Sequence, residues 1–139
     1  MLTNFHLITT TDMKETTKFS WRKRAMAFKY AWQGLVAMVK YEHNARIHLV
    51  AAGVAIVAGF LFEISAMEWC LIVVCIGLVI SAEALNSAVE ALADKITEER
   101  DPLIGRAKDL GATAVTLLAL VAVVVGMIIF LPKIINLFC

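Results

Sequence analysis

Three apolar runs and one periodic segment dominate the pattern of hydrophobic and polar positions. The runs contain no charged residue and cover residues 49–62, 69–82 and 110–131. With their flanks they reach the roughly 20 residues that a membrane-spanning helix needs, and they are too long for barrel strands. We therefore expect three transmembrane helices, the last of which ends before Pro132. The expected spans are about residues 45–65, 68–95 and 107–131.

Residues 19–40 show a periodic pattern instead of a continuous apolar run, because their apolar positions are spaced alternately four and three residues apart. These positions are Trp21, Ala25, Phe28, Trp32, Leu35 and Val39. At 100° per residue they fall within about 40° of one line, which predicts an amphipathic helix lying on a membrane surface. The expected fold is an all-α membrane protein with this surface helix and three transmembrane helices. It would form one domain over residues 19–139, preceded by a flexible tail over residues 1–18.

Composition and charge support a membrane protein rather than a soluble enzyme. Of the 139 residues, 60% are hydrophobic and 18% are charged, against roughly 45–50% and 25% in soluble chains. The net charge of +1 offers no basic excess for nucleic acid. Lys and Arg are concentrated in residues 1–46 and 95–108, whereas residues 63–68 contain none. The positive-inside rule then places the N-terminus and the second loop in the cytoplasm.

The second span carries a polar stripe made of Glu83, Asn86, Glu90 and Asp94. At 100° per residue these four positions share a stripe about 80° wide. One ionised group at mid-membrane costs roughly 2.5–3.5 kcal/mol. The stripe must therefore face protein, water or a cation rather than lipid.

Most of the polar residues in and next to the spans lie at one boundary of the membrane. In the predicted orientation, that level contains Glu42, Glu90, Asp94, Lys108 and Asp109. Only Glu83 lies deeper, by about 10 Å relative to Glu90. Boundary carboxylates can hold Mg²⁺ together with phosphate oxygens, and Lys108 can neutralise phosphate. A deeper carboxylate in apolar surroundings suits a general base.

This arrangement fits phosphoryl transfer from a nucleotide to an alcohol in the membrane, with its active site on the cytoplasmic side. The residues alone leave two alternatives open, a structural role and a small proton-coupled transporter. A transporter would group its carboxylates near the midplane. No glycine-rich phosphate loop of the GxxxxGK[ST] or GxGxxG type occurs in the chain.

Two segments resemble the signature of the small prokaryotic diacylglycerol kinase and undecaprenol kinase family. The first runs from Glu83 through Asn86 and Glu90 to Asp94, and the second is Gly105-Arg-Ala-Lys108-Asp109. The upstream segments 28–35 and 41–46 are also similar to family segments. The resemblance implies an integral-membrane lipid kinase that uses ATP and Mg²⁺ and forms homotrimers.

The resemblance also implies roles for individual residues. Glu83 matches the general base, and Glu42 and Glu90 match the metal-binding glutamates. The nucleotide-contacting positions correspond to Lys23, Tyr30, Lys108 and Asp109. Asn86 and Asp94 match residues that order the site.

Departures from the diacylglycerol kinase pattern concern mainly the lipid side. Lys23 stands where some members carry arginine, which keeps the charge but loses the bidentate fork. His48 replaces an acidic residue and Ala112 replaces a serine. The stretch from Arg46 to Leu49 is more similar to undecaprenol kinases, so we expect a polyprenol acceptor, with diacylglycerol as the other candidate.

Overall fold

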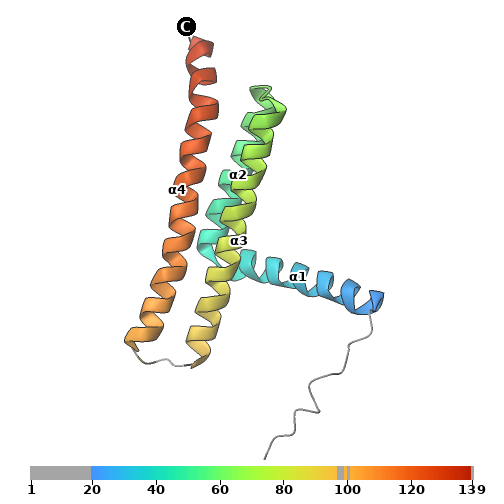
Figure 1. Ribbon diagram of the computed structural model, residues 1–139, viewed down its shortest axis with the longest axis vertical. Coiled ribbons are helices and arrows are strands. Elements are labelled where there is room, and N and C mark those ends of the chain that lie inside the picture. The colour runs from blue at the N-terminus through green and yellow to red at the C-terminus, as the bar shows by residue number, and fades with distance from the viewer. Residues whose placement is uncertain (1–19, 97–98, 100, 139) are drawn as a thin grey trace, which may run out of the picture. The chain divides into compact units, whose positions relative to one another are not determined.

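The structure is a computed structural model that describes residues 20–96, 99 and 101–138. Every regular element in these residues is a helix, in the order α1 (Trp21–Tyr41), α2 (His43–Leu61), α3 (Ala66–Ile96) and α4 (Pro102–Phe138) (Figure 1). The last three are long and apolar enough to cross a membrane. The predicted all-α fold with three candidate spans is thereby confirmed. The tail predicted over residues 1–18 lies outside the described residues.

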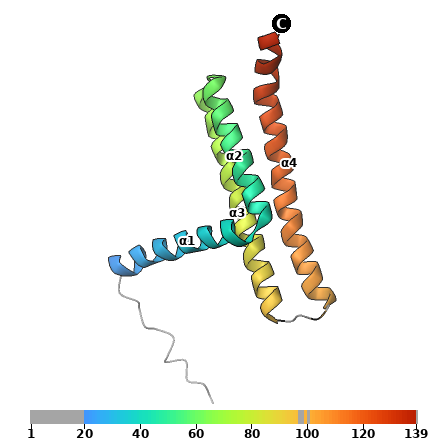
Figure 2. The same ribbon diagram turned by 180° about the vertical axis from the view of Figure 1, so that it is seen from behind.

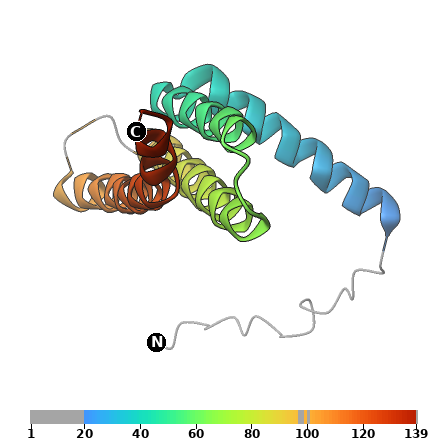
Figure 3. The same ribbon diagram turned by 90° about the horizontal axis from the view of Figure 1, so that it is seen from above.

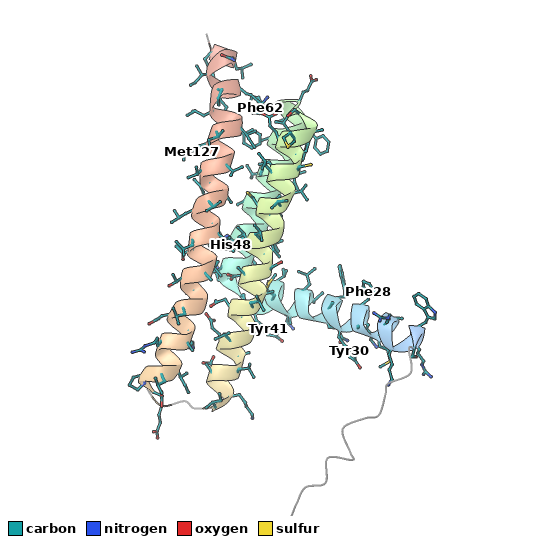
Figure 4. All side chains as sticks on the ribbon, in the orientation of Figure 1. Phe28, Tyr30, Tyr41, His48, Phe62 and Met127 are labelled. Atoms are coloured by element: carbon teal, nitrogen blue, oxygen red, sulfur yellow. The ribbon has the colours of Figure 1, made fainter. Side chains whose placement is uncertain are left out.

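The chain divides into two compact units, Met1–Trp32 and Gln33–Cys139, with the border inside α1. In the first unit the side chains of Trp21 and Phe28 are 78% and 79% exposed. Phe28 and Tyr30 project from α1 in Figure 4. An uncovered line of aromatic side chains on a basic helix is suited to a membrane interface.

The second unit is an antiparallel bundle in which α3 packs against both α2 and α4. Figures 1 and 2 show, from opposite sides, that the chain direction reverses from α2 to α3 and again from α3 to α4. The view from above in Figure 3 shows the same three helices end on. Ile64, Ile72 and Ile129 form the buried core cluster. Most of the large apolar side chains of these helices are exposed, which leaves them for lipid or for other chains.

A tight turn and a capping box join α2 to α3. Ser65 and Glu68 bond reciprocally, with Ser65 N–H donating to Glu68 Oε2 at 2.7 Å and Glu68 N–H donating to Ser65 Oγ at 3.3 Å. These bonds satisfy donors that the helix itself leaves free. Just before the turn, α2 approaches α3 so closely that a Cβ on Gly59 would lie 2.7 Å from the Trp69 ring.

We expect Gly59→Ala to destabilise the bundle by about 1–3 kcal/mol, because the added methyl group overpacks a rigid ring. Thermal unfolding in detergent measures the change. Gly53→Ala is the matched control on the same helix, since a Cβ there meets nothing within 4 Å. Equal melting temperatures for the two variants would contradict the close packing at Gly59.

The last helix is longer than the sequence predicts at both ends. It begins at Pro102 because Asp101 caps it, accepting bonds from Leu103 N–H at 2.8 Å and Ile104 N–H at 3.1 Å. The prediction that it ends before Pro132 is wrong, since α4 continues to Phe138. Beyond the proline, Lys133 Nζ lies 3.6 Å from Glu68 Oε1. This ion pair ties the extension to α3, and proline is tolerated within apolar spans.

Candidate active site

The packed face of α3 changes from apolar to polar along its length. Its buried residues are Ile72, Val79, Glu83, Asn86 and Ala93. Their spacing of three, four and seven residues defines a single helix face. Glu83 and Asn86 therefore lie on the same face of α3 as the apolar core residues, and both face protein. This agrees with the high free energy of exposing polar groups to lipid.

Glu83 is the most deeply buried ionisable group of this face, with an exposed fraction of 2%. Within the part of the chain that the structure describes, its Oε2 atom has no hydrogen-bond partner. Glu42 and Glu90 lie near enough to Glu83 to act on it electrostatically, so the three predicted carboxylates share one part of the bundle. A buried carboxylate oxygen without a partner is uncommon and is often kept for chemistry.

Asn86 links Glu83's neighbourhood to Glu90 one turn further along α3. Its Nδ2 atom donates to Glu90 Oε1 at 2.9 Å. Its own Oδ1 atom is buried and has no partner among the described residues. Because the amide engages one carboxylate oxygen of Glu90, it orients that carboxylate without using the second oxygen.

Glu42 occupies the break between α1 and α2. Its backbone is extended, with φ −95° and ψ 120°, and its side chain makes no capping bond to the described start of α2. The Glu42 carboxylate is therefore not used to cap α2. Arg46 supports the break, since its guanidinium donates to the carbonyl oxygen of Lys40 at 3.1 Å. This contact satisfies a carbonyl that the end of α1 leaves free.

Lys108 of α4 is held by Asp94 of α3. The Nζ to Oδ1 distance is 2.9 Å, and Glu90 adds a further favourable charge. Asp94 is exposed, so the predicted polar stripe is buried only at its deeper end. An exposed ion pair of this kind contributes little to stability, so its main effect is to hold the Lys108 ammonium group at Asp94.

An apolar cavity of about 530 Å³ lies among α2, α3 and α4. Its lining includes Ala55, Ile76, Ala122 and Phe130, and His48 is its one imidazole. His48 (labelled in Figure 4) is contributed by α2, and the α3 residues of the lining include Val79 and Ile80, which precede Glu83 by about one helical turn. The cavity therefore reaches along α3 to within about one helical turn of the buried carboxylate.

Comparison with known families identifies the family to which this chain belongs. The profile described as "Prokaryotic diacylglycerol kinase" matches residues 29–130, which include α2, α3 and most of α4. The chain belongs to this family. It is therefore a lipid kinase, a phosphotransferase that acts on an alcohol. The predicted family is confirmed, and the kinase reading is favoured over the transporter and the purely structural role.

Members of the prokaryotic diacylglycerol kinase family with different names are similar to this chain. The undecaprenol kinase of Bacillus subtilis (strain 168) is 39% identical over 107 residues, which cover 77% of this chain and 87% of that protein. The diacylglycerol kinase of Escherichia coli (strain K12) is 39% identical over 95 residues, covering 68% and 78%. The diacylglycerol kinase of Haemophilus influenzae is 39% identical over 103 residues, covering 73% and 87%.

Four other predicted site residues of this family member are exposed. Lys23 and Tyr30 belong to the other compact unit, where both are exposed. Asp109 and Ala112 are exposed on α4, and their backbone carbonyls accept bonds from Thr113 and Thr116 at 2.7 and 2.9 Å. Their nucleotide-binding and lipid-side roles stay predictions.

Sequence reasoning missed one residue of this kinase that the structure brings to the site. A Cβ on Gly111 of α4 would overlap Asn86 Oδ1 and lie 3.4 Å from Asn86 Cγ. The signal in the sequence was weak, because a glycine in an apolar helix has many possible reasons. Only its place three residues after Lys108, near the start of a span, distinguishes it.

Proposed function

We propose that this lipid kinase transfers the γ-phosphoryl group of ATP to the hydroxyl of undecaprenol, with Mg²⁺ as cofactor. The observation that carries the proposal is the buried oxygen of Glu83, which has no hydrogen-bond partner among the described residues, on the same helix that lines a cavity of hydrocarbon character. Such a site can receive a polar hydroxyl at the carboxylate while its chain stays among apolar side chains.

Glu83 is the general base of the proposed reaction. It accepts the proton of the lipid hydroxyl, whose oxygen forms a bond to the γ-phosphorus. The bond from that phosphorus to the bridging oxygen breaks, and ADP leaves. Phosphoryl transfer of this kind depends on positioning and on charge neutralisation, which the neighbouring charged residues can supply.

The residues present fit a Mg²⁺ ion that arrives with a nucleotide. Among the described side chains, no group of three or more His, Cys, Asp or Glu could hold a metal by itself. Mg²⁺ usually takes only one or two carboxylates together with phosphate oxygens and water. Glu42 and Glu90 would provide these carboxylates, and the ion would neutralise charge on the phosphates.

The nucleotide would contact cationic and polar groups on the cytoplasmic side. Lys108, held by Asp94, would meet a phosphate as a point charge. The other proposed nucleotide contacts, which are inferred from the family motif, are Asp109, Lys23 and Tyr30.

Undecaprenol is proposed over diacylglycerol because of the lipid-side residues. His48 and Ala112 both depart from the diacylglycerol kinase pattern, and His48 lines the apolar cavity. A relative that is 39% identical over 107 residues is also named undecaprenol kinase. Diacylglycerol remains the second candidate, because several relatives of equal identity carry that name.

The proposed setting is the bacterial inner membrane, with the N-terminus and active site facing the cytoplasm, as the distribution of Lys and Arg indicates. A homotrimer is proposed as the assembly. Ala84, Ala88 and Ala91 on α3 are exposed in the single chain, and small residues permit close helix contact within a membrane.

A lipid panel tests the proposal directly. Detergent-solubilised protein is incubated with γ-labelled ATP and undecaprenol, diacylglycerol or no lipid, with Mg²⁺ or with a chelator. We expect labelled lipid only with Mg²⁺, and a kcat/KM for undecaprenol that exceeds that for diacylglycerol by about tenfold or more. Preference for diacylglycerol would support the second candidate, and transfer to neither lipid would contradict both.

A further inference from the structure

α4 approaches the polar face of α3 closely at Gly111, opposite Asn86. A Cβ at this position would overlap Asn86 Oδ1, while lying 3.4 Å from Asn86 Cγ and 3.7 Å from its Cα. The distance to the Cα is an ordinary van der Waals contact, so the backbones of the two helices need not separate. The conflict is therefore with the side-chain amide alone.

The amide of Asn86 has little freedom to avoid such a conflict. Asn86 is 6% exposed, and its Nδ2 atom donates to Glu90 Oε1 at 2.9 Å. Rotation of the amide away from position 111 would move Nδ2 and break this bond. A side chain on residue 111 would thus displace the Asn86 amide and so change the position of the Glu90 carboxylate.

Two other glycines of α4 are under no such restriction. A Cβ on Gly105 or on Gly126 meets nothing within 4 Å in the described chain. Glycine is a poorer helix former than alanine, so its use at position 111 within a long helix calls for a specific reason. The contact with Asn86 supplies that reason.

We infer that Gly111 is a positioning residue of the kinase: the lack of a side chain there seats the Asn86 amide, which in turn orients the Glu90 carboxylate. The inference rests on the proposed function only for the role of Glu90 as a metal ligand. The contact between Gly111 and Asn86 stands on geometry alone. The site thus depends on the register between α3 and α4 as well as on its charged residues.

The first experiment is a double-mutant cycle on thermal unfolding in detergent without Mg²⁺. Gly111→Ala is expected to lower the melting temperature in the wild-type background. In the Asn86→Ala background it is expected to leave it unchanged or raise it, because the conflicting amide is gone. Gly77→Ala on α3 is the control, since a Cβ there meets nothing within 4 Å. Equal effects of Gly111→Ala in both backgrounds would overturn the inferred contact.

The second experiment measures turnover against Mg²⁺ concentration. We expect Gly111→Ala to raise the Mg²⁺ concentration for half-maximal rate by about tenfold, as for the loss of one bond to a charged group. Gly77→Ala should keep the wild-type response. An unchanged Mg²⁺ response in Gly111→Ala would overturn the positioning role. If the wild-type protein phosphorylates no lipid, the proposed function fails, and the metal-free unfolding cycle still decides the Gly111 contact.

Discussion

Replacement of Glu83 by glutamine is expected to reduce phosphoryl transfer by about 10²- to 10⁴-fold, the usual contribution of a general base. Glutamine keeps the size of the side chain but cannot accept the hydroxyl proton. The protein should remain folded with an equal or higher melting temperature, since a buried neutral amide costs less to desolvate than a carboxylate. Initial rates with labelled ATP and lipid, together with thermal unfolding in detergent, measure both effects.

The matched control for this variant is Glu63→Gln, which neutralises an exposed glutamate in the turn between α2 and α3. That variant should retain the wild-type rate. Near-normal turnover of Glu83→Gln would show that the buried carboxylate is not the base. A rise in stability without any loss of rate would instead favour a purely structural role for Glu83.

Glu90→Gln is expected to raise the Mg²⁺ concentration for half-maximal rate by about ten- to a hundredfold. This corresponds to the loss of an interaction with a charged group, about 1.5–3 kcal/mol. The amide oxygen of glutamine can still accept the bond from Asn86 Nδ2, which is 2.9 Å from Glu90 Oε1 in the wild-type protein. The local packing should therefore survive. Turnover is measured over a range of Mg²⁺ concentrations at saturating ATP and lipid.

Glu68→Gln provides the control, because Glu68 lies near the opposite end of α3, where it caps the helix and pairs with Lys133. It should lower stability slightly and leave the Mg²⁺ response unchanged. If Glu90→Gln keeps the wild-type Mg²⁺ response, Glu90 does not belong to the metal site.

Much of the candidate site was predictable because membrane burial restricts polar residues severely. The stripe was expected to face protein, water or a cation, and Glu83 and Asn86 are the buried polar residues of α3. Asp94 shares the stripe by angle but is exposed and bonded to the Lys108 ammonium group, which also fits that expectation. At the end of a helix, the neighbouring chain and solvent decide exposure, and angular position alone does not.

The extent of α4 shows a second limit of sequence reasoning. Pro132 has the same effect on local geometry wherever it occurs, and it predicted a helix end. The helix continues because α4 is packed against α3 and because Lys133 reaches Glu68 across the two helices. The partner residue is 65 positions away in the sequence, so no local pattern indicates this contact.

By itself, the sequence determined the three apolar spans, the amphipathic first helix and the polar face of α3. These features depend on hydropathy and on the 3.6-residue helical period, which are properties of each segment alone. Only the tertiary structure decided that Gly111 meets Asn86, that Lys108 pairs with Asp94 and that His48 lines an apolar cavity. Such contacts depend on the register and distance between helices, which arise from the packing of side chains that are remote in the chain.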